Sequence, residues 1–135
     1  MKGIDMKTAV RYYSRSGNTK AVAEAIAEAA GVNAISVDAA DAAISEPVDV
    51  LFLGGALYKY GIDDHMKAYL ETLNKEIVGK VAVFSTSWFS KHAIDLIKNG
   101  ASEKGIEVVS DSLYVRGKPS DAQKVKAAEF AKKLI

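Results

Sequence analysis

The densest group of chemically useful side chains is a short polar stretch near the amino terminus. Ser14-Arg15-Ser16-Gly17-Asn18-Thr19 holds three hydroxyls, a glycine and an amide within six residues. It follows the β-prone run Thr8–Tyr13 and precedes Lys20–Ala30, an Ala- and Glu-rich segment with helical spacing of its apolar residues. Because the free N–H groups at a helix N-terminus favour an anion, the pattern predicts a phosphate-binding loop.

Each residue type in this loop suits a phosphate. The hydroxyls of Ser14, Ser16 and Thr19 can donate to its oxygens, and the amides of Asn18 and Thr19 complete an anion-binding nest. Gly17 allows close approach of the backbone. The alternative is an ordinary helix cap, for which Ser, Thr and Asn are the preferred residues. One cap needs one such residue and this loop has four, so we favour phosphate.

Missing residues exclude several other phosphate-binding classes. The sequence has neither G-x-x-x-x-G-K-[ST] nor G-x-G-x-x-G, which excludes a nucleoside-triphosphate loop and a dinucleotide fingerprint. It has no cysteine, which excludes a phosphatase with a cysteine in this loop, disulfides, iron–sulfur ligation and a thiolate nucleophile. A response-regulator receiver needs acidic residues after the first strand and at the end of the third. This chain has Ser14, Arg15 and Gly54 at those positions, which excludes this class as well.

Composition narrows the function further. The chain has 135 residues, 49% of them hydrophobic, and a net charge of +1, which suits one domain and gives no electrostatic case for nucleic acid or an acidic membrane. His65 and His92 are far apart, so we expect no metal site. Without a long apolar run or signal segment, we expect a soluble, cytoplasmic protein with one domain over residues 6–135 and a short leader, Met1–Asp5.

Strands and helices are expected to alternate. Further strands are predicted at Asn33–Val37, Val48–Leu53, Lys80–Phe84 and Ile106–Val115, and further helices at Asp38–Ile44, Asp64–Asn74, Lys91–Lys104 and from the Ser120 capping box to Leu134. This order predicts an α/β fold, a three-layer sandwich with a five-stranded parallel sheet and helices on both faces. Ligands bind such sheets at the carboxyl ends of the strands, so the loops after the first, third and fourth strands are the candidate site.

The segment Y-Y-S-R-S-G-N-T-K-A-V-A resembles the FMN phosphate loop of flavodoxins, [ST]-x-[ST]-G-N-T. The likeness covers essentially all of Met6–Ile135 in the order of elements. It implies strand order 2-1-3-4-5 and FMN as the cofactor.

The same resemblance implies two further flavin loops. Trp88, with Tyr58 or Tyr60, would flank the flavin ring, and backbone amides around Ala56, Leu57, Thr86 and Ser87 would reach its polar edge. Gly61 is the candidate for a peptide that turns over on reduction, and Phe89 either packs in the core or meets the dimethyl edge. The expected cofactor-binding residues are Ser14, Arg15, Ser16, Gly17, Asn18, Thr19, Ala56, Leu57, Tyr58, Tyr60, Gly61, Thr86, Ser87, Trp88 and Phe89. No catalytic residue is expected.

The resemblance implies a monomeric electron-transfer protein that shuttles low-potential electrons between a reductase and an acceptor protein. One alternative is a flavin-dependent oxidoreductase acting on a quinone, nicotinamide or porphyrinogen, because G-G-A-L-Y-K-Y-G is similar to the second loop of flavodoxin-like protoporphyrinogen oxidases. Another is a binding domain that has lost its flavin.

His65 is either a solvated first-turn residue or a proton donor, His92 is structural, and Arg15 either points to solvent or attracts phosphate. The neutral charge departs from the acidic character of typical carriers.

Overall fold

The computed structural model describes residues 7–58, 61–88 and 90–135, in which strands and helices alternate along the chain. Tyr60 and Phe89, and the expected leader Met1–Asp5, lie outside these ranges. The elements are β1 (Thr8–Tyr12), α1 (Asn18–Ala30), β2 (Ala34–Ser36), β3 (Val48–Ala56), α2 (Asp64–Glu71), β4 (Val78–Thr86), α3 (His92–Glu103), β5 (Glu107–Val115) and α4 (Asp121–Lys132).

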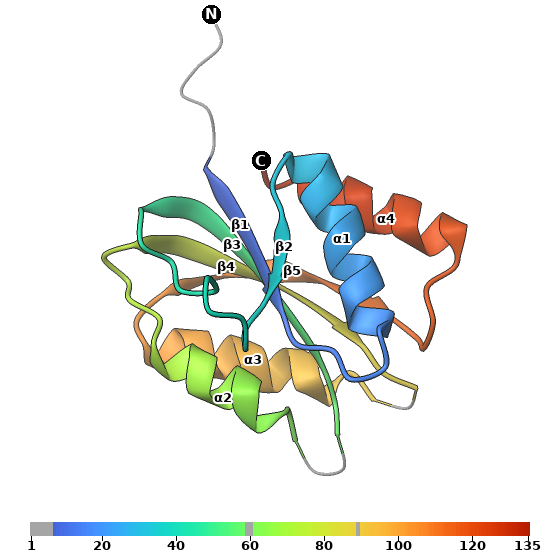
Figure 1. Ribbon diagram of the computed structural model, residues 1–135, viewed down its shortest axis with the longest axis horizontal. Helices are drawn as coiled ribbons and strands as arrows, with labels where there is room; N and C mark the ends of the chain where they lie inside the picture. The colour runs from blue at the N-terminus through green and yellow to red at the C-terminus, as the bar shows by residue number, and fades with distance from the viewer. Residues whose placement is uncertain (1–6, 59–60, 89) are drawn as a thin grey trace, which may run out of the picture.

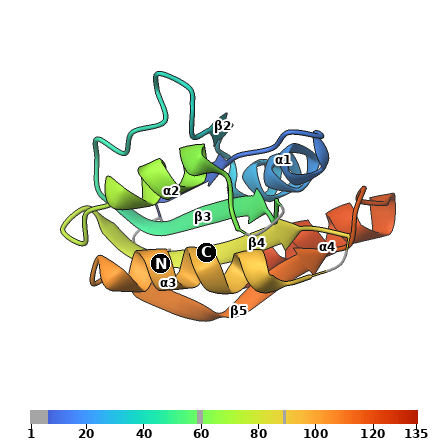
Figure 2. The same cartoon turned by 90° about the horizontal axis from the view of Figure 1, so that it is seen from below.

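The strands form one five-stranded sheet of order β2-β1-β3-β4-β5, and all neighbouring strands are parallel. Helices α1 and α4 cover one face of the sheet, and α2 and α3 cover the other (Figures 1 and 2). This arrangement confirms the fold class and the strand order. It follows from the sequence because parallel strands need helical crossovers, which protect both faces from water.

The sheet separates two hydrophobic clusters. Side chains alternate across β3, so that Val50 and Phe52 pack with α1 and α4, whereas Leu51 and Leu53 pack with α2 and α3. All four side chains are completely buried. The continuous apolar run of β3 therefore contributes side chains to both layers of the core. This burial on both faces holds β3, and with it the start of the second candidate loop, in place.

One expected element is absent. The sequence predicts a brief helix over Asp38–Ile44, but the described chain forms turns there. The carbonyl of Ala42 accepts a hydrogen bond from Arg11 Nε at 2.7 Å and another from the Tyr69 hydroxyl at 2.6 Å. Because these side chains come from β1 and α2, tertiary hydrogen bonds replace the local bonds that a helix would make.

The element ends also differ from expectation. Strands β3 and β4 run on to Ala56 and Thr86, so these two site residues end strands rather than lying in free loops. The capping box at Ser120 is confirmed, and Gly31 ends α1 in a left-handed conformation. Among the described residues, no helix combines the length and apolar character needed to cross a membrane.

Candidate functional site

The three candidate loops meet at one edge of the sheet. The parallel register aligns Tyr12 with Gly54 and Ala56 with Thr86, so β1, β3 and β4 all end at the same edge. The backbone N–H of Tyr13 also donates to the carbonyl of Gly54 at 3.1 Å. In Figure 1 these connections lie together at the lower end of the sheet. The fold thus brings together segments separated by some 70 residues of chain.

The first loop leads into α1 through a glycine. Gly17 is the N-cap residue, with a left-handed φ of 92°, and it has no side chain of its own with which to cap the helix. The Ser14 hydroxyl accepts from the Gly17 N–H at 2.9 Å, and the Ser16 hydroxyl accepts from the Asn18 N–H at 3.4 Å. The space that a Cβ of Gly17 would take is open. The loop therefore fits a phosphate better than it fits a simple cap.

Thr19 links the first loop to the third. It is buried, and its Oγ1 lies 2.6 Å from Oγ1 of Thr86 at the end of β4. One hydroxyl proton is used within this pair, which leaves the other proton able to donate to a nearby acceptor. The pair therefore fixes the distance between the two loops and keeps one donor at their junction.

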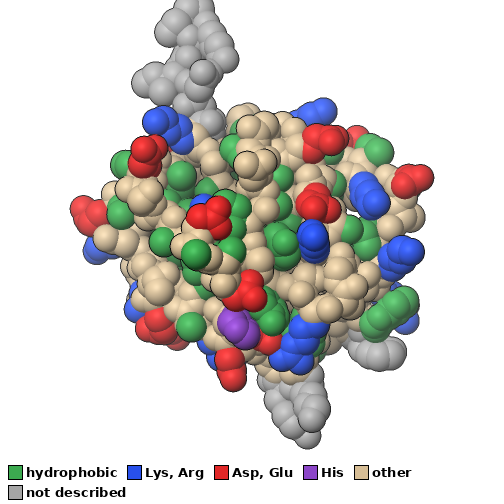
Figure 3. Space-filling model, viewed as in Figure 1, with side chains coloured by type: hydrophobic (Ala, Val, Ile, Leu, Met, Phe, Trp, Pro, Cys, Tyr) green, Lys and Arg blue, Asp and Glu red, His purple; other side chains and the backbone are tan. Residues whose placement is uncertain are grey.

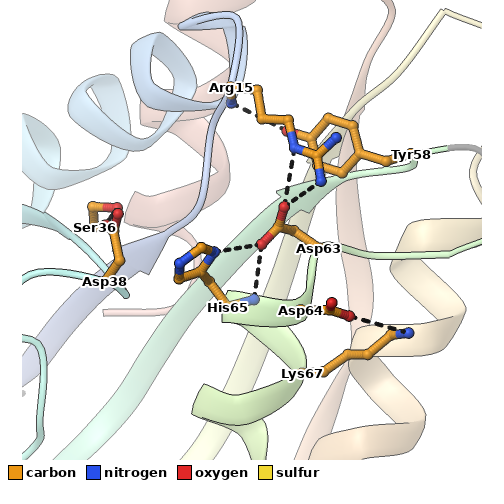
Figure 4. A network of polar contacts seen from close by, with 8 residues as sticks. All are labelled: Arg15, Ser36, Asp38, Tyr58, Asp63, Asp64, His65 and Lys67. Carbon is orange, nitrogen blue, oxygen red and sulfur yellow. Dashed lines mark hydrogen bonds and ion pairs between the residues drawn. The ribbon is translucent and has the colours of Figure 1, made fainter.

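Arg15 links the first loop to the second (Figure 4). Its backbone N–H donates to the Tyr58 hydroxyl at 3.2 Å, and its guanidinium carbon lies 3.9 Å from the centre of the Tyr58 ring. Its Nε donates to Oδ2 of Asp63 at 3.0 Å. Although 55% exposed, the side chain thus turns toward the second loop and is not simply directed to solvent.

Asp63 is the centre of this network. It caps α2 by accepting from the His65 N–H at 2.8 Å, and it also contacts Nδ1 of His65 at 2.8 Å. Burial alone would raise the pKa of Asp63, but the hydrogen bonds from His65 and Arg15 outweigh it and hold the pKa below its ordinary value. A buried carboxylate with these partners stays ionised at neutral pH.

His65 lies in the first turn of α2 and is exposed, at the position expected for a solvated first-turn residue. Its ring stacks on Tyr13, with 4.7 Å between the ring centres and 11° between the planes. Tyr13 directly precedes the polar loop. The stack therefore adds a second link between the first and second loops.

In the second loop, Tyr58 and Gly61 are paired through their backbones. The Tyr58 N–H donates to the Gly61 carbonyl at 2.7 Å, and the Gly61 N–H donates to the Tyr58 carbonyl at 3.0 Å. Ala56 and Leu57, which precede Tyr58, are half-buried. Burial comes first among the effects that raise the pKa of Tyr58, so its hydroxyl stays protonated and can accept from Arg15.

The third loop is held by the connection after β5. The Tyr114 hydroxyl donates to the Ser87 carbonyl at 2.6 Å, and Arg116 Nε donates to the Trp88 carbonyl at 2.9 Å. The Trp88 side chain is 57% exposed and lies over Gly117, where an added Cβ would come within 2.5 Å of the indole. Trp88 and Tyr58 thus occupy two adjoining loops, each packed against a neighbour of its own.

Sequence reasoning placed the expected residues at this edge but missed several that support them. The roles of Tyr13, Asp63, Tyr114, Arg116 and Gly117 were not predicted. For Asp63 a signal existed, because an aspartate directly before a helical apolar stripe is a typical N-cap. The other four act through tertiary contacts that no local pattern encodes. Within the described ranges no cluster of His, Asp and Glu is suited to hold a metal ion.

The sequence and the fold both match known proteins. Residues 9–133 match the family model of the flavodoxin domain, and the chain belongs to this family. A flavodoxin from the domain Archaea is 26% identical, with a TM-score of 0.80 over 96% of this chain and 99% of that one. Oxidised flavodoxin 1 from Bacillus cereus is 23% identical, with a TM-score of 0.77 over 95% of this chain and 96% of that one.

The same fold also occurs within a longer protein. Rubredoxin oxygen:oxidoreductase from the anaerobe Desulfovibrio gigas is 16% identical, with a TM-score of 0.81 over 95% of this chain but only 35% of that one. At this identity the likeness concerns the fold alone.

Proposed function

We propose that this protein binds FMN at the three loops and carries electrons between redox partner proteins. The observation that carries the proposal is the first loop, where a left-handed Gly17 N-cap brings the Ser14 and Ser16 hydroxyls to the start of α1. Membership of the flavodoxin family supports the same cofactor.

The phosphate would lie at the start of α1. The free N–H groups of the first turn would donate to its oxygens. The Ser14 and Ser16 hydroxyls, which accept from backbone N–H groups within the loop, would donate their own protons to it. Thr19 and Thr86 would contribute the remaining proton of their hydroxyl pair. Because these groups are fixed by α1 and β4, the loop needs little rearrangement to bind.

The flavin ring would lie between the second and third loops. Arg15 covers one face of the Tyr58 ring, so Tyr58 has only its other face to offer. Tyr60 remains the alternative partner for the ring, together with Trp88. Bound FMN supplies the one- and two-electron chemistry, and the residues of this chain bind it, orient it and leave its edge accessible.

The proposal assigns no acid–base residue to this chain. His65 is engaged by Asp63 and stacked on Tyr13, so its contacts already account for its position. We therefore infer a carrier that needs a reductase and an acceptor, and that works as a cytoplasmic monomer.

A reduction experiment tests the carrier against the enzyme. The FMN-loaded protein is mixed anaerobically with NADPH or NADH, with and without a flavodoxin reductase, and loss of flavin absorbance is followed. We expect reduction only with the reductase. Rapid reduction by the nicotinamide alone, at a rate that saturates with its concentration, would instead indicate an oxidoreductase with its own substrate.

A further inference from the structure

A cleft beside the third loop extends beyond the FMN site proposed above and shares only Trp88 with it. Its volume is about 330 Å³, and it lies between the start of α3 and the end of β5. It is lined by Trp88, Ser90, Lys91, Tyr114 and Arg116, and we call it the basic cleft. The lining contains two cations and no Asp or Glu, which marks it as a site for negative charge.

The two cations are held at the surface by neighbouring aromatic and backbone groups. Lys91 Nζ lies 5.4 Å from the centre of the Tyr114 ring, and Arg116 donates from Nε to the Trp88 carbonyl at 2.9 Å. Both side chains are exposed, and exposed Lys118 follows two residues after Arg116. The ion pairs found within the described ranges involve neither Lys91 nor Arg116. Their positive charge is therefore open to an acidic partner.

The cations on the α2 side of the candidate site have acidic partners. Acidic and basic side chains are interspersed over the face seen in Figure 3, as the net charge of +1 implies. On the other side of the candidate site, Asp63 takes up the charge of Arg15, and Asp64 lies 3.8 Å from Lys67. Around the candidate loops, Arg15 and Lys67 thus have acidic partners, whereas Lys91 and Arg116 on the β5 side have none among the described ion pairs.

We propose that the basic cleft docks an acidic surface of the protein that exchanges electrons with the flavin, an inference that rests on the proposed function. Carboxylates of the partner would pair with Lys91 and Arg116, and one electron at a time would pass between reduced flavin and the oxidised centre of the partner. A protein fits better than a small anion because the cleft is open to solvent beside an exposed tryptophan. Trp and Arg are the side chains that most often dominate protein interfaces.

The test uses two haem proteins of opposite charge as probes. Flavin-free, ¹⁵N-labelled protein is titrated with an acidic b5-type cytochrome and with a basic c-type cytochrome at low ionic strength. We expect the acidic cytochrome alone to shift the backbone amides of residues 88, 90, 91 and 114–118, and the shifts to vanish at high salt. The double variant Lys91→Gln with Arg116→Gln should weaken this binding about tenfold.

A control variant shows whether the loss of binding is specific to the basic cleft. Lys75→Gln removes an exposed lysine from the α2–β4 connection, at the opposite edge of the sheet, and should leave binding unchanged. Equal binding of the acidic cytochrome by wild type and the double variant would overturn the proposal. Shifts at the cleft with NADP⁺ but none with the cytochrome would overturn it in favour of a small anion.

The kinetic arm connects docking to electron transfer. With FMN bound and reduced, one electron passes to the ferric haem, and the second-order rate constant for the acidic cytochrome should fall about tenfold in the double variant. An unchanged rate constant would contradict the role in electron transfer. Because the titration uses no flavin, failure of docking is distinguishable from failure to bind FMN.

Discussion

Gly17 has a backbone conformation that side chains with a Cβ tolerate poorly. Its φ is 92°, and no atom lies within 4 Å of the place where a Cβ would stand, so the penalty of Gly17→Ala comes from the backbone rather than from a clash. We expect this variant to lower the free energy of unfolding by about 1–2 kcal/mol. It should also weaken FMN binding about tenfold, because the loop no longer holds its geometry. Urea unfolding and flavin fluorescence measure the two effects.

Gly31→Ala is the matched control for this change. Gly31 ends the same helix with a φ of 74° and is equally free of contacts at the Cβ position, but it lies at the far end from the loop. It should lose a similar amount of stability and keep its affinity for FMN. Equal loss of FMN affinity in both variants would show that Gly17 acts only through the stability of α1.

Asp63 makes stability depend on pH. The pKa of its carboxyl is lower in the folded than in the unfolded state, so the unfolded state binds more protons in acid. The contribution of Asp63 to the free energy of unfolding is complete above the unfolded-state pKa of about 3.9, and it is lost as the pH falls through the folded-state pKa. Urea unfolding between pH 5 and pH 3 should therefore show a steeper fall in stability for wild type than for Asp63→Asn. Parallel curves would contradict this assignment.

At the scale of the elements, Gly54 of β3 packs directly against the Phe84 ring of β4. A Cβ there would come within 2.1 Å of the Phe84 ring, which is fully buried and has no room to move. At Gly55, the next residue, the nearest side-chain atoms are 3.6 and 3.8 Å away, at ordinary contact distance. We expect Gly54→Ala to cost about 3 kcal/mol in the free energy of unfolding and Gly55→Ala to be nearly neutral. Comparable losses in the two variants would contradict the packing described here.

The segment between β2 and β3 depends on side chains from other elements. The Tyr69 hydroxyl donates to the Ala42 carbonyl, so Tyr69→Phe should lower the free energy of unfolding by about 1 kcal/mol. Amide hydrogen exchange should accelerate for residues 39–45. Tyr114→Phe removes a hydrogen bond of the same length to Ser87 and should leave exchange in that segment unchanged. Exchange in residues 39–45 that is unaffected by Tyr69→Phe would show that this bond does not anchor the segment.

Regular periodicity explains which elements were predictable. The apolar run of β3 and the helically spaced residues Met66, Tyr69 and Leu70 of α2 belong to the core, so their burial follows from the sequence. The segment Asp38–Ile44 has helix-forming alanines, but its conformation is decided by Arg11 and Tyr69, which are distant in sequence. Local propensity is overridden there by two hydrogen bonds that only the tertiary structure supplies.

In the molecule as a whole, the edge of the sheet determines where function lies. The parallel order alone places the loops after β1, β3 and β4 side by side, and this much was predictable from the sequence. The contacts that hold them together were not, since Arg15 meets Asp63 across 48 residues and Thr19 meets Thr86 across 67. Residue types thus predict the chemistry of the loops, and the fold decides which side chains support these loops.

The central claim is that these loops bind FMN, and a titration tests it most directly. Flavin-free protein is added to FMN while flavin fluorescence is recorded, and the visible spectrum of the complex is taken at saturation. The account predicts quenching that ends at one FMN per chain, with perturbed flavin bands, and weaker binding by Gly17→Ala. Fluorescence that stays unquenched at concentrations where the protein is folded would contradict it, and the polar loop would then serve another phosphate.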